Sequence, residues 1–350
     1  WEKEEPEFHG EFFNFPPARF EPKPVQKPSI PILIGGESER ALKRVAALGD
    51  GWSARVHTPE SLRADLQKIH AMRKAAGLGY LLARTSDTLA DTATIPTESR
   101  LACLDGFAQS VVRDVPLARW PVQVLNAVAD ASERHLLECA ADLIDWLRRL
   151  PEGEASLVRE VVKIIIGGQQ LDLRRFADAE NGRITALPDD AALDDYTWRV
   201  AGCVGAFWTK LGFLTLGGEF STTPVSELID LGVNYGKGLQ LVNILRDLPA
   251  DLVNGRCYLP VRDPHDSVSL LESHQQWLSR ADEKIDAGFQ YAKTLRSRRL
   301  RSASVLPAMI ARETLALMRG ADWSSLNARV KVSRQQVYLA LLRAMVGRVG

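Results

Sequence analysis

The segment GLQLVNILRDLPADLVNGRCYLP, residues 238–260, carries the most informative pattern in this chain. Asp247 and Asp251 are four residues apart, and on a helix this spacing places both carboxylates on one face, one turn apart. Asn243 lies one turn before Asp247 and extends the same polar stripe. Pro249 stands between the two aspartates, so we expect the helix to kink or end just before Asp251.

A second acidic pair has the same spacing. The segment YLLARTSDTLAD, residues 80–91, contains Asp87 and Asp91, with Arg84 and Tyr80 earlier on the same helical face. Two such helices facing each other would bring four carboxylates together in a helical bundle, a suitable site for a hard cation with oxygen ligands.

The spacing alone is weak, because Asp190/Asp194 and Asp282/Asp286 repeat it and solvated acidic faces explain those pairs. The residues around Asp87/Asp91 and Asp247/Asp251 distinguish these two pairs from the other two. They include amides and arginines on the same helical stripe, which suit a metal–diphosphate clamp. The alternative is an interhelical salt-bridge network, which uses the same residue types. These neighbours are Arg84, Gln240, Arg246 and Arg256.

The composition is that of an ordinary soluble globular protein, with 45% apolar and 25% charged residues among 350. Lys+Arg and Asp+Glu are both 44, so nothing in the charge balance indicates a nucleic-acid partner. The four cysteines show no metal-ligand spacing and predict free thiols in a reducing compartment. The chain has no uninterrupted run of about eighteen apolar residues. We therefore expect a cytoplasmic protein, with membrane association left open.

The chain reads as two unlike parts. Residues 1–36 are rich in proline and aromatic residues and predict a short strand before Gly35, followed by a helix over 37–48. A second helix is predicted from Thr58-Pro59 to Gly77. Residues 80–350 predict a mainly all-α domain, with a domain boundary that separates it from residues 1–79. The helices expected there are 99–113, 121–149, 155–178, 191–216, 224–248, 268–297, 303–319 and 333–347.

The motifs of the second part resemble those of squalene and phytoene synthases. YLLARTSDTLAD resembles the first aspartate-rich motif of that family, and residues 238–260 resemble the second. YTWRVAGCVG, residues 196–205, is similar to a tyrosine- and glycine-containing helix of the family. VLPAMIARETLALM (305–318) and VKVSR (330–334) match its pocket-lining helix and basic segment. The resemblance implies an isoprenoid-synthase-type helical bundle over residues 80–350.

The same resemblance implies a Mg²⁺-dependent head-to-head condensation of two prenyl diphosphates, such as farnesyl diphosphate, to presqualene diphosphate and squalene or a related product. It leaves NADPH use, the exact product, the oligomeric state and a peripheral membrane contact for product release open. It implies that the metal is held by Asp87, Asp91, Asn243, Asp247 and Asp251. It implies that the diphosphates are bound by Arg84, Arg246, Arg256 and Lys331. It places Tyr80, Tyr196 and Gln240 at the reacting centre.

The first part resembles a different family. Residues 1–52, ending in GDGW, resemble the C-terminal part of a luciferase-like flavin or deazaflavin monooxygenase, which implies a short α/β fragment of an incomplete TIM-type barrel in residues 1–79. Such a fragment leaves strand edges open, so we expect no flavin chemistry from it alone. The chain begins at Trp1. The resemblance leads us to expect that the helical segment which squalene and phytoene synthases carry before Tyr80 is missing. The alternatives are a flavin-dependent oxidoreductase, a truncated and catalytically impaired fusion, and a non-catalytic prenyl-lipid-binding protein.

Overall fold

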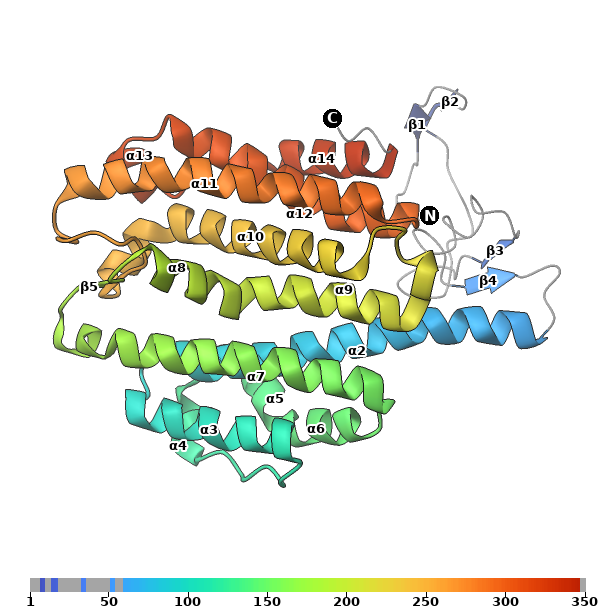
Figure 1. Ribbon diagram of the computed structural model, residues 1–350, viewed down its shortest axis with the longest axis horizontal. Helices are drawn as coiled ribbons and strands as arrows, with labels where there is room; N and C mark the ends of the chain where they lie inside the picture. The colour runs from blue at the N-terminus through green and yellow to red at the C-terminus, as the bar shows by residue number, and fades with distance from the viewer. Residues whose placement is uncertain (1–6, 10–13, 18–32, 36–50, 54–58, 347–350) are drawn as a thin grey trace. The chain divides into compact units, whose positions relative to one another are not determined.

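A computed structural model describes part of the first 58 residues and all of residues 59–346 (Figure 1). In the first part the described residues are 7–9, 14–17, 33–35 and 51–53. The chain divides into two compact units, Trp1–Leu66 and Gln67–Gly350. The helix predicted over 37–48 lies outside the described residues.

The first unit contains two strand pairs. β1 (Phe8–His9) pairs antiparallel with β2 (Asn14–Phe15), and β3 (Leu33–Gly35) pairs in parallel with β4 (Gly51–Ser53). β3 is the strand predicted before the glycine turn, and β4 includes Gly51 and Trp52 of the GDGW motif. Apart from the start of α2, the described residues of this unit contain only these two strand pairs as regular elements, so the barrel fragment stays a prediction.

The second unit is helical, which confirms the mainly all-α prediction. α2 begins in the first unit and continues into the second. The long helices are α2 (Pro59–Asp91), α3 (Thr97–Arg113), α7 (Glu152–Arg175), α10 (Val225–Val253), α11 (Ser267–Thr294) and α12 (Arg298–Arg319). The short helices are α4 (Val122–Ala127), α5 (Ala131–Glu138), α6 (Ala140–Arg148), α8 (Asp190–Thr197), α9 (Cys203–Leu216), α13 (Trp323–Asn327) and α14 (Arg334–Val346).

Short elements complete the second unit. A π-helical segment, η2 (Trp198–Gly202), joins α8 to α9 without a break. The short strands β5 (Thr185–Ala186) and β6 (Arg256–Cys257) pair in parallel and fix the chain just after α10. The 3₁₀ turns are η1 (Ala177–Asn181) and η3 (Gly217–Glu219).

α2 does not end at Gly77, so that prediction was wrong. A glycine inside a helix costs only about 1 kcal/mol relative to alanine. Leu78 and Leu82 of the same helix are fully buried, and burying one leucine side chain stabilises by about 1.5–3 kcal/mol. The burial of these leucines therefore outweighs the cost of the glycine, and the helix continues past Gly77. The assignment of residues 1–79 and 80–350 to separate domains stays a prediction, whereas the compact units divide between Leu66 and Gln67.

The single helix predicted over 121–149 is also wrong, because the structure has α4, α5 and α6 there. Val128 ends α4 in an extended conformation. Asp130 then caps α5 by accepting hydrogen bonds from the amides of Ser132 and Glu133. An aspartate before an alanine-serine pair is an N-cap signal, and it interrupts the apolar pattern at this point.

α10 passes through Pro249 and continues to Val253, so the expected end of the helix before Asp251 was wrong. Proline removes the amide that would donate to the carbonyl of Leu245, four residues earlier. His274 of α11 lies at that carbonyl instead, with its Nε2 atom 3.1 Å from the oxygen. The helix therefore continues to the second aspartate.

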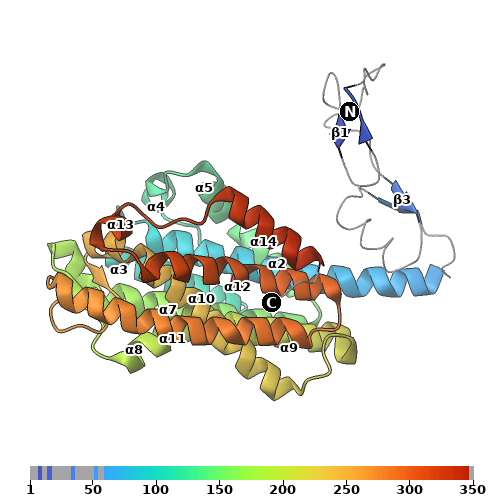
Figure 2. The same ribbon diagram turned by 90° about the horizontal axis from the view of Figure 1, so that it is seen from above.

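α10 lies centrally in the second unit, beside α9 and α11 (Figures 1 and 2). Its contact with α9 depends on two glycines, because a Cβ atom on Gly205 would lie 1.9 Å from the carbonyl oxygen of Gly232. Backbones this close require glycine. The close contact fixes α9, and with it η2 and α8, against α10.

The segment Asp190–Glu219 is long and apolar enough, by length and composition, to cross a membrane, and 33% of its most apolar window is buried. The segment is interrupted by Lys210, in keeping with the absence of an unbroken apolar run from the sequence. Phe207 and Leu211 of this segment pack in the core of the bundle. A core helix of a soluble protein passes the same test of length and composition.

The continuity of α2 can be tested at Gly77, where an added Cβ atom would meet nothing within 4 Å. We expect Gly77→Ala to raise the free energy of unfolding by about 0.5–1 kcal/mol, because alanine restricts the unfolded chain and favours the helix. The control is Gly182→Ala, which should destabilise, because Gly182 has φ +73°. Urea denaturation measures both changes. Destabilisation by Gly77→Ala would contradict a continuous helix.

Candidate active site

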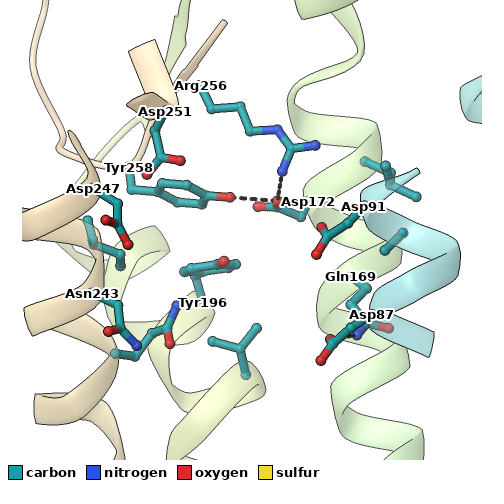
Figure 3. Close-up of a pocket in the computed structure, with 15 residues that line it drawn as sticks. Asp87, Asp91, Gln169, Asp172, Tyr196, Asn243, Asp247, Asp251, Arg256 and Tyr258 are labelled. Atoms are coloured by element: carbon teal, nitrogen blue, oxygen red, sulfur yellow. Dashed lines mark hydrogen bonds and ion pairs between the residues drawn. The ribbon is translucent and has the colours of Figure 1, made fainter. Parts of the chain in front are cut away.

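A cavity of about 380 Å³ lies in the second unit, between α2, α7, α8, η2, α10 and the segment after α10 (Figure 3). Its walls are mostly polar, with a few aliphatic side chains between the polar groups. The lining residues are Asp87, Ala90, Asp91, Gln169, Asp172, Leu173, Tyr196, Val200, Gln240, Asn243, Ile244, Asp247, Asp251, Arg256 and Tyr258.

The two informative aspartate pairs meet in this cavity. Figure 3 shows Asp87 and Asp91 on one side and Asp247 and Asp251 on the other. Asn243 lies one turn before Asp247, on the same side of the cavity as that residue. Segments more than 150 residues apart therefore contribute to one site, as the spacing of each pair predicts.

The other two pairs with this spacing form ion pairs outside the cavity. Asp194 accepts from Lys237 at 2.7 Å and Asp190 accepts from Arg280 at 2.5 Å. Asp282 pairs with Arg319 at 2.6 Å, and Asp286 pairs with Arg312. These four aspartates have structural partners, as the solvated-face interpretation predicts.

Burial dominates the electrostatics of the cavity. It raises the pKa of Asp87 to about 6, with a further contribution from the charge of Asp91. It raises the pKa of Asp251 to about 7, and the charge of Asp247 adds to this. Burial also raises the pKa of Asp91, although that residue is the more exposed of its pair. Carboxylates that resist ionisation together favour a cation between them.

Helix α7 supplies a third wall that the sequence analysis missed. Gln169 and Asp172 are three residues apart on α7 and are each 8% exposed. Gln169 donates from Nε2 to Oδ1 of Asp87 at 2.5 Å. The available signal was two polar residues at helical spacing in the apolar stretch IIIGGQQLDL, residues 164–173.

Asp172 connects α7 to the segment that follows α10. The hydroxyl of Tyr258 donates to Oδ2 of Asp172 at 2.8 Å, and Nη1 of Arg256 lies 3.5 Å from the same oxygen. Burial raises the pKa of Asp172 to about 6 against the opposing effect of these two partners. Tyr196 stacks on Tyr258 with ring centroids 4.6 Å apart and an interplanar angle of 25°. Burial raises the pKa of both phenols, so they stay protonated.

Four of the predicted residues do not line the cavity. Tyr80 is 68% exposed. Arg84 pairs with Glu133 of α5. Arg246 donates from Nε to Oδ1 of Asp247 at 3.0 Å. Lys331 is exposed.

Arg329, which directly precedes the basic segment 330–334, contacts one of the aspartates that line the cavity. Its Nε atom lies 3.5 Å from Oδ1 of Asp247. It has φ +61°, a left-handed backbone conformation that is uncommon outside glycine. Lys331, two residues later, is the residue that the resemblance implied, and its role in diphosphate binding stays a prediction.

The donor set suits a divalent cation bound together with a diphosphate. Within residues 59–346 and the described parts before them, no three His, Cys, Asp or Glu residues lie close enough to hold a metal by themselves. Mg²⁺ typically takes one or two carboxylates and completes its shell with water and substrate phosphate. Paired carboxylates on facing walls match that requirement.

Comparison with known proteins gives the family. The sequence model of the squalene/phytoene synthase family matches residues 66–336. The chain belongs to this family. The model of luciferase-like monooxygenases matches residues 1–100, in agreement with the resemblance of the first part.

Several relatives cover part of the chain. Presqualene diphosphate synthase of Zymomonas mobilis is 29% identical over 220 residues, which are 56% of this chain and 69% of that protein. Squalene synthase of Saccharomyces cerevisiae is 27% identical over 205 residues, 58% of this chain and 43% of that protein. An uncharacterized protein of Mycobacterium tuberculosis is 35% identical over 107 residues. The chain spans about a third of that relative's length, 31%.

Solved structures share the fold. The structure of TcSQS with a bound ligand has a TM-score of 0.64 and 22% identity, covering 79% of each chain. A dehydrosqualene synthase in complex with a ligand has a TM-score of 0.51 and 18% identity, covering 81% of this chain and 91% of that one. These similarities confirm the isoprenoid-synthase-type helical bundle.

The raised pKa values predict how stability depends on pH. The pKa values of Asp87 (about 6) and Asp251 (about 7) in the folded protein exceed the ordinary aspartate pKa of 3.8, so the folded protein holds these protons more tightly. The resulting stabilisation is present below about pH 4 and is lost as pH rises through these values. We expect Asp251→Asn to raise the free energy of unfolding at about pH 8 by about 1–2 kcal/mol, and to change it little at about pH 4. Denaturation at both pH values tests this, and an equal effect at both would contradict it.

Proposed function

We propose that the chain catalyses the Mg²⁺-dependent condensation of two prenyl diphosphates, with farnesyl diphosphate as the substrate, to presqualene diphosphate and then to squalene or a related product. The observation that carries the proposal is the single cavity lined by both aspartate pairs together with Arg256. Relatives that carry the names presqualene diphosphate synthase and squalene synthase support it.

The aspartates on the two walls of the cavity would bind the diphosphate groups of the two substrates through Mg²⁺. Asp87 and Asp91 would hold Mg²⁺ on the α2 side, and Asp247 and Asp251 on the α10 side with Asn243. Bound Mg²⁺ would neutralise charge on the departing diphosphate. The carboxylates fix where that charge is neutralised, because each pair is attached to one rigid helix.

Arg256 adds a permanent positive charge at the side of the cavity. Asp172 and the β5–β6 pairing hold the arginine there, so the guanidinium needs little rearrangement to bind a phosphate oxygen. A guanidinium that is already oriented contributes more to binding than a mobile one.

The stacked Tyr196 and Tyr258 suit an allylic cation. Their aromatic rings offer π-faces, and their hydroxyls stay protonated and are therefore poor nucleophiles. Leu173, Val200 and Ile244 line the same cavity and help exclude water, which would otherwise capture a carbocation.

The luciferase-like match to residues 1–100 favours a flavin-dependent oxidoreductase as a second candidate. A flavin needs the cofactor-binding strands of a barrel, and the described part of the first unit has two short strand pairs. Flavin bands in the absorbance spectrum of the purified chain would support this candidate over the first.

The condensation is tested by incubating the protein with labelled farnesyl diphosphate and Mg²⁺, with and without NADPH, and identifying the products. We expect Asp87→Asn and Asp247→Asn each to lower turnover by roughly 100-fold or more, because each removes charge that holds the leaving group. The matched control is Asp190→Asn, which alters a pair of the same spacing that is bound to Arg280 outside the cavity. Unchanged turnover in both cavity variants would rule out the metal clamp.

The contact between α7 and α2 gives a further prediction with a control at the next residue. Gln169→Met removes the donor to Asp87 at similar volume, and we expect the Mg²⁺ concentration for half-maximal rate to rise about 10–100-fold. Gln170→Met is the control, because Gln170 donates to Asp105 outside the cavity. Equal Mg²⁺ requirements in the two variants would show that Gln169 does not position Asp87.

A further inference from the structure

Pro249 interrupts the hydrogen-bond ladder of α10 between the two aspartates of the second motif. The carbonyl of Leu245 has no helical donor, because the residue four positions later lacks an N–H group. A proline ring also presses against the carbonyl four residues earlier and turns it away from the helix axis. The turn that carries Asp247 and leads to Asp251 therefore lacks one of its own hydrogen bonds.

His274 supplies a replacement from the neighbouring helix. It is fully buried, and its Nε2 atom lies 3.1 Å from the carbonyl oxygen of Leu245. A carbonyl oxygen only accepts, so Nε2 carries the proton and donates. Burial lowers the pKa of His274, which favours the neutral imidazole. Nδ1 then carries the lone pair, and within the described residues it has no hydrogen-bond partner.

The surroundings of His274 are apolar. Leu245, Leu270 and Leu278 of the same α10–α11 interface are at most 2% exposed. An aliphatic side chain would fill this position without leaving a ring nitrogen unsatisfied. The imidazole therefore contributes through its hydrogen bond. His274 does not line the cavity, so any effect on the site passes through Leu245.

We propose that His274 is a positioning residue that replaces the amide missing at Pro249 and so keeps Asp247 and Asp251 on one face of α10. The consequence for metal binding rests on the proposed function, whereas the hydrogen bond itself does not. Without the donor, the freed carbonyl of Leu245 would have to turn toward water or another donor, and the following turn would move with it.

A double-mutant cycle separates this role from ordinary packing. The variants are His274→Leu, Pro249→Ala and the double variant, because alanine at 249 restores the helical amide that His274 replaces. The measurement is Mn²⁺ binding in the presence of inorganic pyrophosphate, followed by the paramagnetic resonance signal of free Mn²⁺. We expect His274→Leu to weaken Mn²⁺ binding about 10-fold or more and Pro249→Ala to leave it within about 2-fold of wild type. The double variant should bind nearly as tightly as Pro249→Ala.

Controls and turnover complete the test. His265→Leu, at an exposed histidine, should bind Mn²⁺ like wild type. In turnover, His274→Leu should raise the Mg²⁺ requirement, and Pro249→Ala should reverse the increase. Should His274→Leu fail to fold, recovery of folding in the double variant is the same test.

The outcomes are distinct. No effect of His274→Leu, or no recovery by Pro249→Ala, would overturn the inference and leave a packing role. Mn²⁺ binding by a wild-type protein that makes no prenyl product would overturn the proposed function and leave the inference intact. A wild-type protein that binds no Mn²⁺ with pyrophosphate would overturn both.

Discussion

The cost of ionising carboxylates in one partly buried cavity, to which their mutual repulsion adds, is the constraint on which the rest of the site depends. α2 and α10 each direct two aspartates into it, and burial raises the pKa of Asp87 to about 6 and of Asp251 to about 7. An arrangement that disfavours its own ionised state near neutral pH costs stability. A cation bound between the carboxylates would offset this cost, which is why the cavity suits a ligand better than it serves the stability of the fold.

The neighbouring groups reduce this repulsion without removing it. Gln169 donates to Asp87, and its hydrogen bond opposes the rise in the pKa of that residue. Arg256 acts in the same direction on Asp251 and on Asp172. Because α7 contributes both Gln169 and Asp172, this helix connects the α2 wall to the segment after α10. The distance between the two acidic walls is therefore set by three helices rather than two.

The sequence predicted those parts of the site that depend on local spacing. Four residues of separation on a helix fixed the direction of each aspartate pair, and residues 80–91 and 238–260 could be recognised by themselves. Partners that are distant in sequence could not be found this way. The resemblance implies that Arg84 binds diphosphate, which stays a prediction, and its ion pair with Glu133, 49 residues later, could not be read from the local sequence. Gln169 reaches Asp87 across 82 residues, and no local pattern encodes that contact.

The predicted helix ends at a proline and at a glycine were wrong, and tertiary contacts occur at both positions. Pro249 predicts the end of a helix, yet α10 continues to Val253, and His274 of α11 lies at hydrogen-bond distance from the buried carbonyl that the proline leaves without a helical donor. Gly77 predicts a stop, yet α2 continues because Leu78 and Leu82 are buried.

The two family matches overlap over residues 66–100, and most of this overlap lies in α2. The change from one family to the other therefore occurs within a regular helix rather than in a linker. The same helix that leaves the first unit carries Asp87 and Asp91. Leu78, Leu82 and Leu89 of α2 are buried in the core of the second unit, so packing within that unit sets the orientation of this aspartate pair.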